Sequence, residues 1–111
     1  MITPQNVIDE LASIRAQSEK GVKLLGDAEN KMIELKIAAD RIELSAFLAA
    51  NGTGADKTAI AKFAALDAKE AADKAAAEVS YIKSRLKQLS ESQMAVQTTA
   101  RMVELEYKSI H

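Results

Sequence analysis

A seven-residue apolar repeat on both sides of one glycine-rich segment is the feature that most constrains the fold of this chain. The repeat runs without a slip through residues 4–50 and resumes in residues 57–110. Its period of about 3.5 residues is typical of a left-handed coiled coil. The segment between the repeats, Asn51-Gly52-Thr53-Gly54-Ala55-Asp56, contains residues that accept the positive φ angles of a chain reversal. The sequence therefore predicts an antiparallel helical hairpin with a turn at 51–56.

Two positions of each heptad form two seam columns on each arm, and the columns suggest how the arms pair. Folding the chain about the turn places residue i opposite roughly residue 106−i, so that small residues face large ones. The alanines of 61–75 then face Leu35 and Ile42, which we expect to be buried. Gly21 and Ser18 face Leu86 and Leu89. In the first arm, one column is Pro4, Leu11, Ser18, Leu25, Met32, Ala39 and Ala46, and the other is Val7, Ile14, Gly21, Ala28, Leu35, Ile42 and Ala49. In the second arm, one column is Thr58, Ala65, Ala72, Val79, Leu86, Gln93, Ala100 and Tyr107, and the other is Ala61, Ala68, Ala75, Ile82, Leu89, Val96, Val103 and Ile110.

Short signals place the helix ends. Thr3 is expected to cap the first helix, because Pro4 fits the first helical position. Asp56 is expected to cap the second helix, which should then continue as one helix from about 57 to 110. The weakest point is Gly21 to Gly26, since glycine disfavours a helix interior. A break there would give three helices, whereas the unbroken heptad phase favours two.

Composition supports a single all-α domain over residues 1–111. Alanine is abundant, aromatic residues make up 4% of the chain, and the one proline is Pro4. Such a chain favours helices over strands. Two bare helices bury little apolar surface at this size, so we expect the hairpin to associate with a second copy into a helical bundle.

A second apolar stripe in the first arm points to that association. Ile33, Ile37, Leu44 and Phe47, with Leu48, recur at helical spacing away from the seam. Either a second chain covers this stripe, or a kinked N-terminal segment folds back over it. Ile60 and Phe63 lie off the seam near the turn, and we expect them to join Phe47 and Leu48 in one patch. That patch is interpreted as the core of a dimer or as a docking site for another protein. The predicted protein interface is Ile33, Ile37, Leu44, Phe47, Ile60 and Phe63.

The sequence contains no recognisable catalytic, metal-binding or cofactor-binding motif. The chain has no cysteine and its one histidine is His111, so nucleophile–base pairs and histidine-rich zinc sites are not available. The glycines of the turn lack the Gly-Lys-Ser/Thr of a phosphate loop. We therefore expect a non-enzymatic protein with no metal, no cofactor and no small-molecule substrate. No signal peptide or membrane-spanning run is present, and a cytoplasmic protein is expected.

The stretch from Val79 to Val103 suggests a nucleic-acid-binding surface. Glu91 is its one acid, and hydroxyl and amide side chains fill the gaps between its cations. Long basic side chains among such groups suit contacts to phosphates. The alternative is a polar surface that pairs with acids of the first arm, such as Asp9 and Glu10. The candidate nucleic-acid-binding residues are Lys83, Arg85, Lys87 and Arg101.

Two segments resemble parts of small, helical, largely uncharacterised proteins of tailed bacteriophages, found near phage recombination genes. One is Ala46-Phe47-Leu48-Ala49-Ala50-Asn51-Gly52-Thr53 at the turn. The other is Lys83-Ser84-Arg85-Leu86-Lys87-Gln88-Leu89, with Gln93, Arg101 and Glu104 beyond it. The similarity covers the last two-thirds of the chain. It implies an accessory role in phage DNA metabolism with no established catalytic activity.

Two function hypotheses follow. In the first, the chain is a phage-type accessory protein in the cytoplasm of a bacterial or phage-infected cell. Its second helix binds DNA, with single-stranded DNA as the favoured form, or a DNA-processing partner. In the second, the protein is an adaptor or inhibitor that binds another protein through the apolar patch near the turn. Added salt separates the two, because phosphate contacts weaken steeply with salt and apolar contacts do not.

Overall fold

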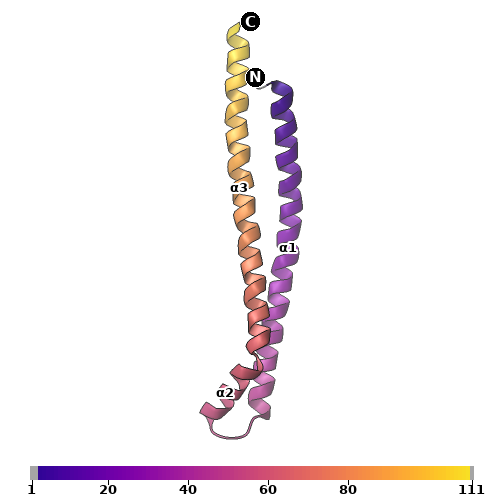
Figure 1. Cartoon of the computed structure of the whole chain (residues 1–111). Helices are drawn as coiled ribbons and strands as arrows, with labels where there is room; N and C mark the ends of the chain where they lie inside the picture. The colour runs from indigo at the N-terminus through magenta and orange to yellow at the C-terminus, as the bar shows by residue number, and fades with distance from the viewer. Residues whose placement is uncertain (1–2, 111) are drawn as a thin grey trace. The chain divides into compact units, whose positions relative to one another are not determined.

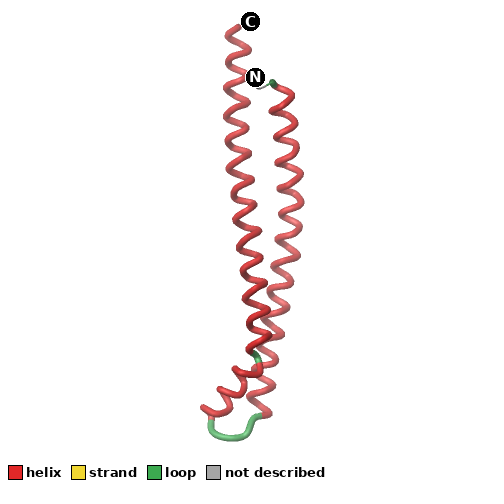
Figure 2. Tube along the Cα trace, viewed as in Figure 1, coloured by secondary structure: helices red, strands yellow, loops and turns green. Residues whose placement is uncertain are grey.

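The computed structural model describes residues 3–110, apart from the side chain of Ile110, and contains three helices. Helix α1 spans Pro4–Ala49, α2 spans Gly54–Ala64 and α3 spans Leu66–Ile110 (Figure 1). Within the described residues there is no strand (Figure 2). The prediction of an all-α helical hairpin is confirmed.

The packing divides the chain into two compact units, each with parts of both arms. In its described residues, the first unit pairs 3–24 of α1 with 82–110 of α3. The second unit is 25–81, which comprises the rest of α1, the turn, α2 and the start of α3. Each unit therefore has a small core of its own.

Helix α1 begins as the sequence predicts and runs without interruption. The backbone N–H of Asn6 donates to Thr3 Oγ1 at 3.2 Å, and Pro4 is the first helical residue. No break occurs at Gly21 to Gly26, so the three-helix alternative based on those glycines is excluded. An N-terminal segment that folds back from a break there is excluded with it.

Buried residues coincide with the predicted seam columns. The ten apolar residues that are buried in the described part of the chain all lie on those columns. In the first unit Val7, Ile14 and Val96 form a cluster, against which Leu11 and Ala100 pack. Gly21 lies against Leu86 as predicted, because a Cβ atom added to Gly21 would be 2.7 Å from Leu86 Cδ2. The buried set is Val7, Ile14, Ala28, Ala39, Ala61, Ala65, Ala72, Ala75, Val79 and Val96.

Neither of the two large side chains that the sequence analysis expects in the core of the second unit, Leu35 and Ile42, is fully buried. Leu35 is half-buried, but Ile42 remains 42% exposed, so its predicted burial is wrong. The core of the second unit consists of alanines and Val79. Alanines bring helix axes close together, and a large side chain beside such a contact is pushed to its flank. Ile42 therefore borders the seam instead of filling it.

The second arm contains a break that the sequence did not predict. Helix α2 ends at Ala64, and Ala65 has φ −91° and ψ 0° before α3 begins at Leu66. The predicted single helix over 57–110 is therefore wrong. No glycine or proline causes the break. Ala65 is completely buried, which indicates that tertiary packing at this point overrides the helical propensity of alanine.

The start of α2 also differs from the prediction. Thr53, not Asp56, is the N-cap residue, and α2 begins at Gly54. Thr53 Oγ1 accepts from the N–H of Asp56 at 3.2 Å, and Asp56 Oδ2 accepts from the N–H of Thr53 at 3.3 Å. This reciprocal pair is a capping box. Gly52 reverses the chain with φ +118°, a conformation that favours glycine.

The two glycines of α1 provide a matched test of the seam. A Cβ atom at Gly26 would meet nothing within 4 Å, so Gly26→Ala should raise the free energy of unfolding by up to about 1 kcal/mol. Gly21→Ala makes the same gain in helix propensity but forces Leu86 to move, at a cost of about 1–3 kcal/mol. It should therefore bring no net gain. Urea denaturation followed by circular dichroism measures both variants, and equal stabilisation would contradict the contact between Gly21 and Leu86.

A second matched pair tests which large side chains form the core. Ile14 is 7% exposed, and Ile14→Ala should lower the free energy of unfolding by about 2–5 kcal/mol. Ile42→Ala should cost about 1 kcal/mol or less, because that side chain already contacts water. Denaturation curves at one protein concentration make the comparison. A larger loss for Ile42 than for Ile14 would place Ile42 back in the core.

Candidate interaction surfaces

The outer face of α1 is an exposed apolar stripe made by Ile33, Ile37, Leu44, Phe47 and Leu48 (hereafter the outer face of α1). Ile33 is 50%, Leu44 60% and Leu48 73% exposed. Successive helical residues turn by about 100°, so a residue two places from Leu35 and from Ala39, both seam positions, points away from the seam. Ile37 occupies that place. At Ile37 the face therefore lies opposite the contact with the second arm, and its side chains remain exposed in the described chain.

Helix α2 carries a separate apolar surface, made by Ile60 and Phe63. Ile60 is 48% and Phe63 81% exposed. Ala61 and Ala65 are buried, and Phe63 is two residues from each, so its side chain lies on the opposite side of α2. The predicted single patch that joins Ile60 and Phe63 to Phe47 and Leu48 therefore divides into two surfaces. The prediction of one patch was wrong because it considered only how far along the hairpin each residue lies. It did not consider in which direction each side chain points from its helix.

A groove separates these two surfaces on one side of the second unit. Leu44 and Phe47 of α1 line it together with Thr58 and Ala61 of α2, and its volume is about 310 Å³. Phe47 is 36% exposed, the lowest value in the outer face of α1. Lys69 Nζ pairs with Glu43 Oε2 at 2.7 Å and ties the start of α3 to α1 nearby.

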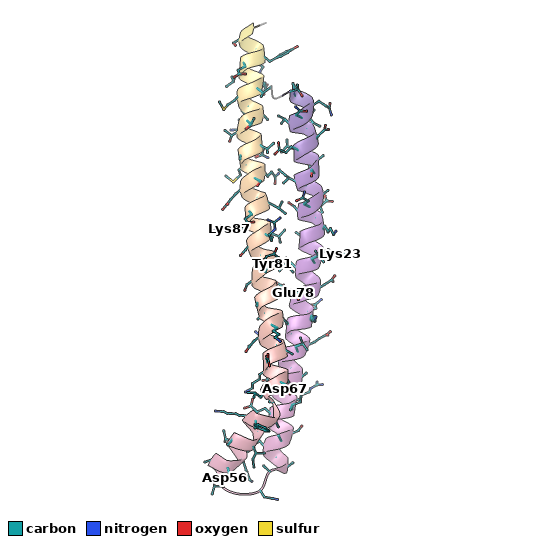
Figure 3. All side chains as sticks on the ribbon, in the orientation of Figure 1. Lys23, Asp56, Asp67, Glu78, Tyr81 and Lys87 are labelled. Atoms are coloured by element: carbon teal, nitrogen blue, oxygen red, sulfur yellow. The ribbon has the colours of Figure 1, made fainter. Side chains whose placement is uncertain are left out.

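The predicted basic residues of α3 do not form one cluster. Lys83, Lys87 and Arg101 are exposed and lie within about 40° of one another around the helix. Figure 3 shows the Lys87 side chain on the side of α3 away from α1. Arg85 is two residues from both lysines and therefore lies on another side of the helix. The two-residue spacing in the sequence already indicated that Arg85 lies apart from Lys83 and Lys87.

Arg85 instead belongs to a polar groove between the arms of the first unit. Its Nη1 donates to Gln88 Oε1 at 2.8 Å. Glu10 and Gln17 of α1 line the same groove, whose volume is about 390 Å³. The position of Arg85 in one groove with Glu10 fits the alternative in which cations of the second arm face acids of the first arm. Among the four candidate residues, only Arg85 lines this groove.

An apolar groove at the open end of the first unit was not predicted as a groove. Its volume is about 390 Å³ and its lining is almost wholly apolar. Tyr107, which lies on a predicted seam column of the second arm, forms part of its wall. Small Ala100 on the seam leaves the space that a larger residue would fill. The lining residues are Pro4, Val7, Ile8, Leu11, Ala100, Val103, Glu104, Tyr107 and Lys108.

Charged side chains in the described chain pair mainly with one another along the surface of the same helix. Lys74 pairs with Glu70 at 3.3 Å and Lys108 with Glu104 at 3.0 Å, both four residues apart. Over residues 3–110 no group of three or more histidine, cysteine or acidic side chains is placed to hold a metal ion. None of the described helices has the length and apolar character that a membrane span requires.

The chain was compared with protein-family models, curated proteins and solved structures, and none of them matches. The surfaces described above are therefore the basis for a functional proposal.

Proposed function

We propose that this chain is a non-enzymatic adaptor that binds a partner protein through Ile60 and Phe63 of α2. The observation that carries the proposal is the exposure of Phe63, at 81%, beside Ile60 at 48%. A large aromatic side chain in water is unfavourable, and aromatic residues are common anchors of protein interfaces. Ile60 and Phe63 are three residues apart, which is the spacing of anchors that a helix inserts into an apolar groove.

The local structure of α2 suits recognition by a groove. The capping box of Thr53 and Asp56 holds the first turn, so less order has to be gained on binding. The break at Ala65 ends α2 after 11 residues and separates it from α3. Ala61 and Ala65 fix the opposite side of α2 against the rest of the unit. The partner therefore meets a preformed helix whose apolar side faces outward.

The resemblance to tailed-phage proteins suggests the setting. In that setting the partner is a DNA-processing protein in the cytoplasm of an infected bacterium, and the adaptor recruits or inhibits it. The segment of the resemblance at the turn, Ala46 to Thr53, ends at the N-cap of α2.

Affinity purification from the source cells tests the adaptor proposal. The wild-type chain should retain a defined partner that survives added salt, because apolar contacts are not screened. Ile60→Ala/Phe63→Ala should lose it. Lys83→Ala/Lys87→Ala/Arg101→Ala, the matched control on α3, should keep it. Mass spectrometry identifies the retained proteins, and the purified pair should then bind with the same dependence on Phe63. A partner kept by the α2 variant and lost by the α3 variant would contradict the proposal.

A second candidate function, binding of single-stranded DNA, is favoured by one specific observation. Lys83, Lys87 and Arg101 share an exposed side of α3, and exposed polar residues lie between them. From Lys83 to Arg101 the distance along the helix is about 27 Å, at about 1.5 Å per residue. Glu91 follows Lys87 by four residues and weakens the positive field of that side. Three spaced cations suit weak contacts to a phosphate backbone without base recognition.

Fluorescence titration of a labelled oligonucleotide at several salt concentrations tests this second function. Each phosphate contact on a single strand releases about 0.7 counterions, so removing Lys83, Lys87 and Arg101 together should reduce the salt slope by about two. Arg85→Ala is the matched control, because Arg85 lies in the polar groove, and it should change the slope little. Affinity should be similar for different base sequences. No binding by the wild-type protein at low salt would exclude the function, and circular dichroism should show unchanged helix content in each variant.

A further inference from the structure

The aliphatic residues of the outer face of α1, without Phe47, form a pattern that reads the same in both directions. These residues are Ile33, Ile37, Leu44 and Leu48, separated by four, seven and four positions. When a second copy is turned end over end, this pattern meets itself. A two-fold interface requires such a self-complementary surface, because each copy contributes the same residues.

The small intramolecular core gives this face a reason to be covered. Among the side chains that the structure describes, six of the ten buried residues are alanine and no large side chain is fully buried. A chain of this size buries a modest share of its apolar surface, and association with a second copy is one way to add a core. Ile33, Ile37, Leu44 and Leu48 each remain at least 47% exposed in the single chain.

We infer that the outer face of α1 pairs with the same face of a second copy, antiparallel about a two-fold axis between Asp40 and Arg41. Residue i then meets roughly residue 81−i of the other copy. Ile33 packs against Leu48, and Ile37 packs against Leu44. The continuous helix through this region keeps all four side chains on one face.

Charges beside the stripe fit this arrangement. Lys36 and Glu43 are seven residues apart, so they occupy the same flank of α1. In the antiparallel pair, Lys36 of each copy lies beside Glu43 of the other, whose carboxylate also pairs with Lys69 of its own chain at 2.7 Å. Asp40 is the exception, because the two Asp40 carboxylates approach each other near the axis and repel. Asp40→Asn should therefore tighten the dimer, and this increase is a specific result of the proposed register.

Sedimentation velocity tests the association and its surface. The wild-type chain should sediment as a dimer at tens of micromolar, and Leu44→Asp should sediment as a monomer with the same circular dichroism spectrum. Phe63→Asp is the matched control on α2 and should remain dimeric. The dimer and the adaptor function can thus be refuted independently, because the dimer depends on Leu44 and the adaptor function depends on Phe63. A wild-type monomer would overturn the inference and leave the face to another protein. A dimer unaffected by Leu44→Asp would overturn it as well.

Disulfide trapping tests the register, because the natural chain contains no cysteine. Asp40→Cys alone should form a disulfide-linked dimer in mild oxidant, since the position lies next to the axis and near its own copy. Ile33→Cys alone and Leu48→Cys alone should not cross-link, whereas an equimolar mixture of the two should. Non-reducing electrophoresis separates the products. Efficient cross-linking by Ile33→Cys alone would indicate a parallel pair and would contradict the inferred axis.

Discussion

Close contact between small residues along the seam is the interaction on which the rest of this structure depends. Ala28, Ala39, Ala72 and Ala75 are buried, while most of their larger neighbours in the second unit, with the exception of Val79, remain half-buried or exposed. Alanine contributes little apolar area, so such a seam sets the distance between helices more than it stabilises them. The apolar side chains that could supply a larger core therefore point outward. The exposed faces of α1 and α2 follow from this choice of seam residues.

The break at Ala65 gives the second arm a separate short helix that a continuous arm would not have. In one continuous helix, Ile60 and Phe63 would be two exposed residues on a long arm. With the break, they lie on an 11-residue helix that has its own capping box and its own end. The buried alanines on one side of α2 hold it in place, and the exposed side remains available. A short, fixed helix is a better recognition element than a mobile loop, because its anchors keep their spacing.

Periodicity predicted the seam well, because burial along a helix pair depends on which residues share a face. Every buried residue lies on a predicted column, and Gly21 meets Leu86 as expected. The break at Ala65 could not be predicted, because it has no local signal and depends on tertiary packing. The predicted burial of Ile42 was wrong for a related reason. Ile42 lies on a correctly predicted seam column, but its neighbours on the other arm are small. The separate positions of Arg85 and Phe63 were within reach of the sequence, because residues two apart lie on opposite sides of a helix.

The two apolar surfaces of the second unit lie on different helices with a groove between them, and this has a consequence for assembly. Ile37 lies opposite the seam on α1, and Phe63 lies opposite Ala61 and Ala65 on α2. A second copy on the first surface therefore leaves the second surface open. The proposed dimer then presents two copies of the α2 surface on one particle. If a partner is itself oligomeric, the second contact forms at a raised effective concentration, so a weak helix-in-groove contact is enough for stable recruitment.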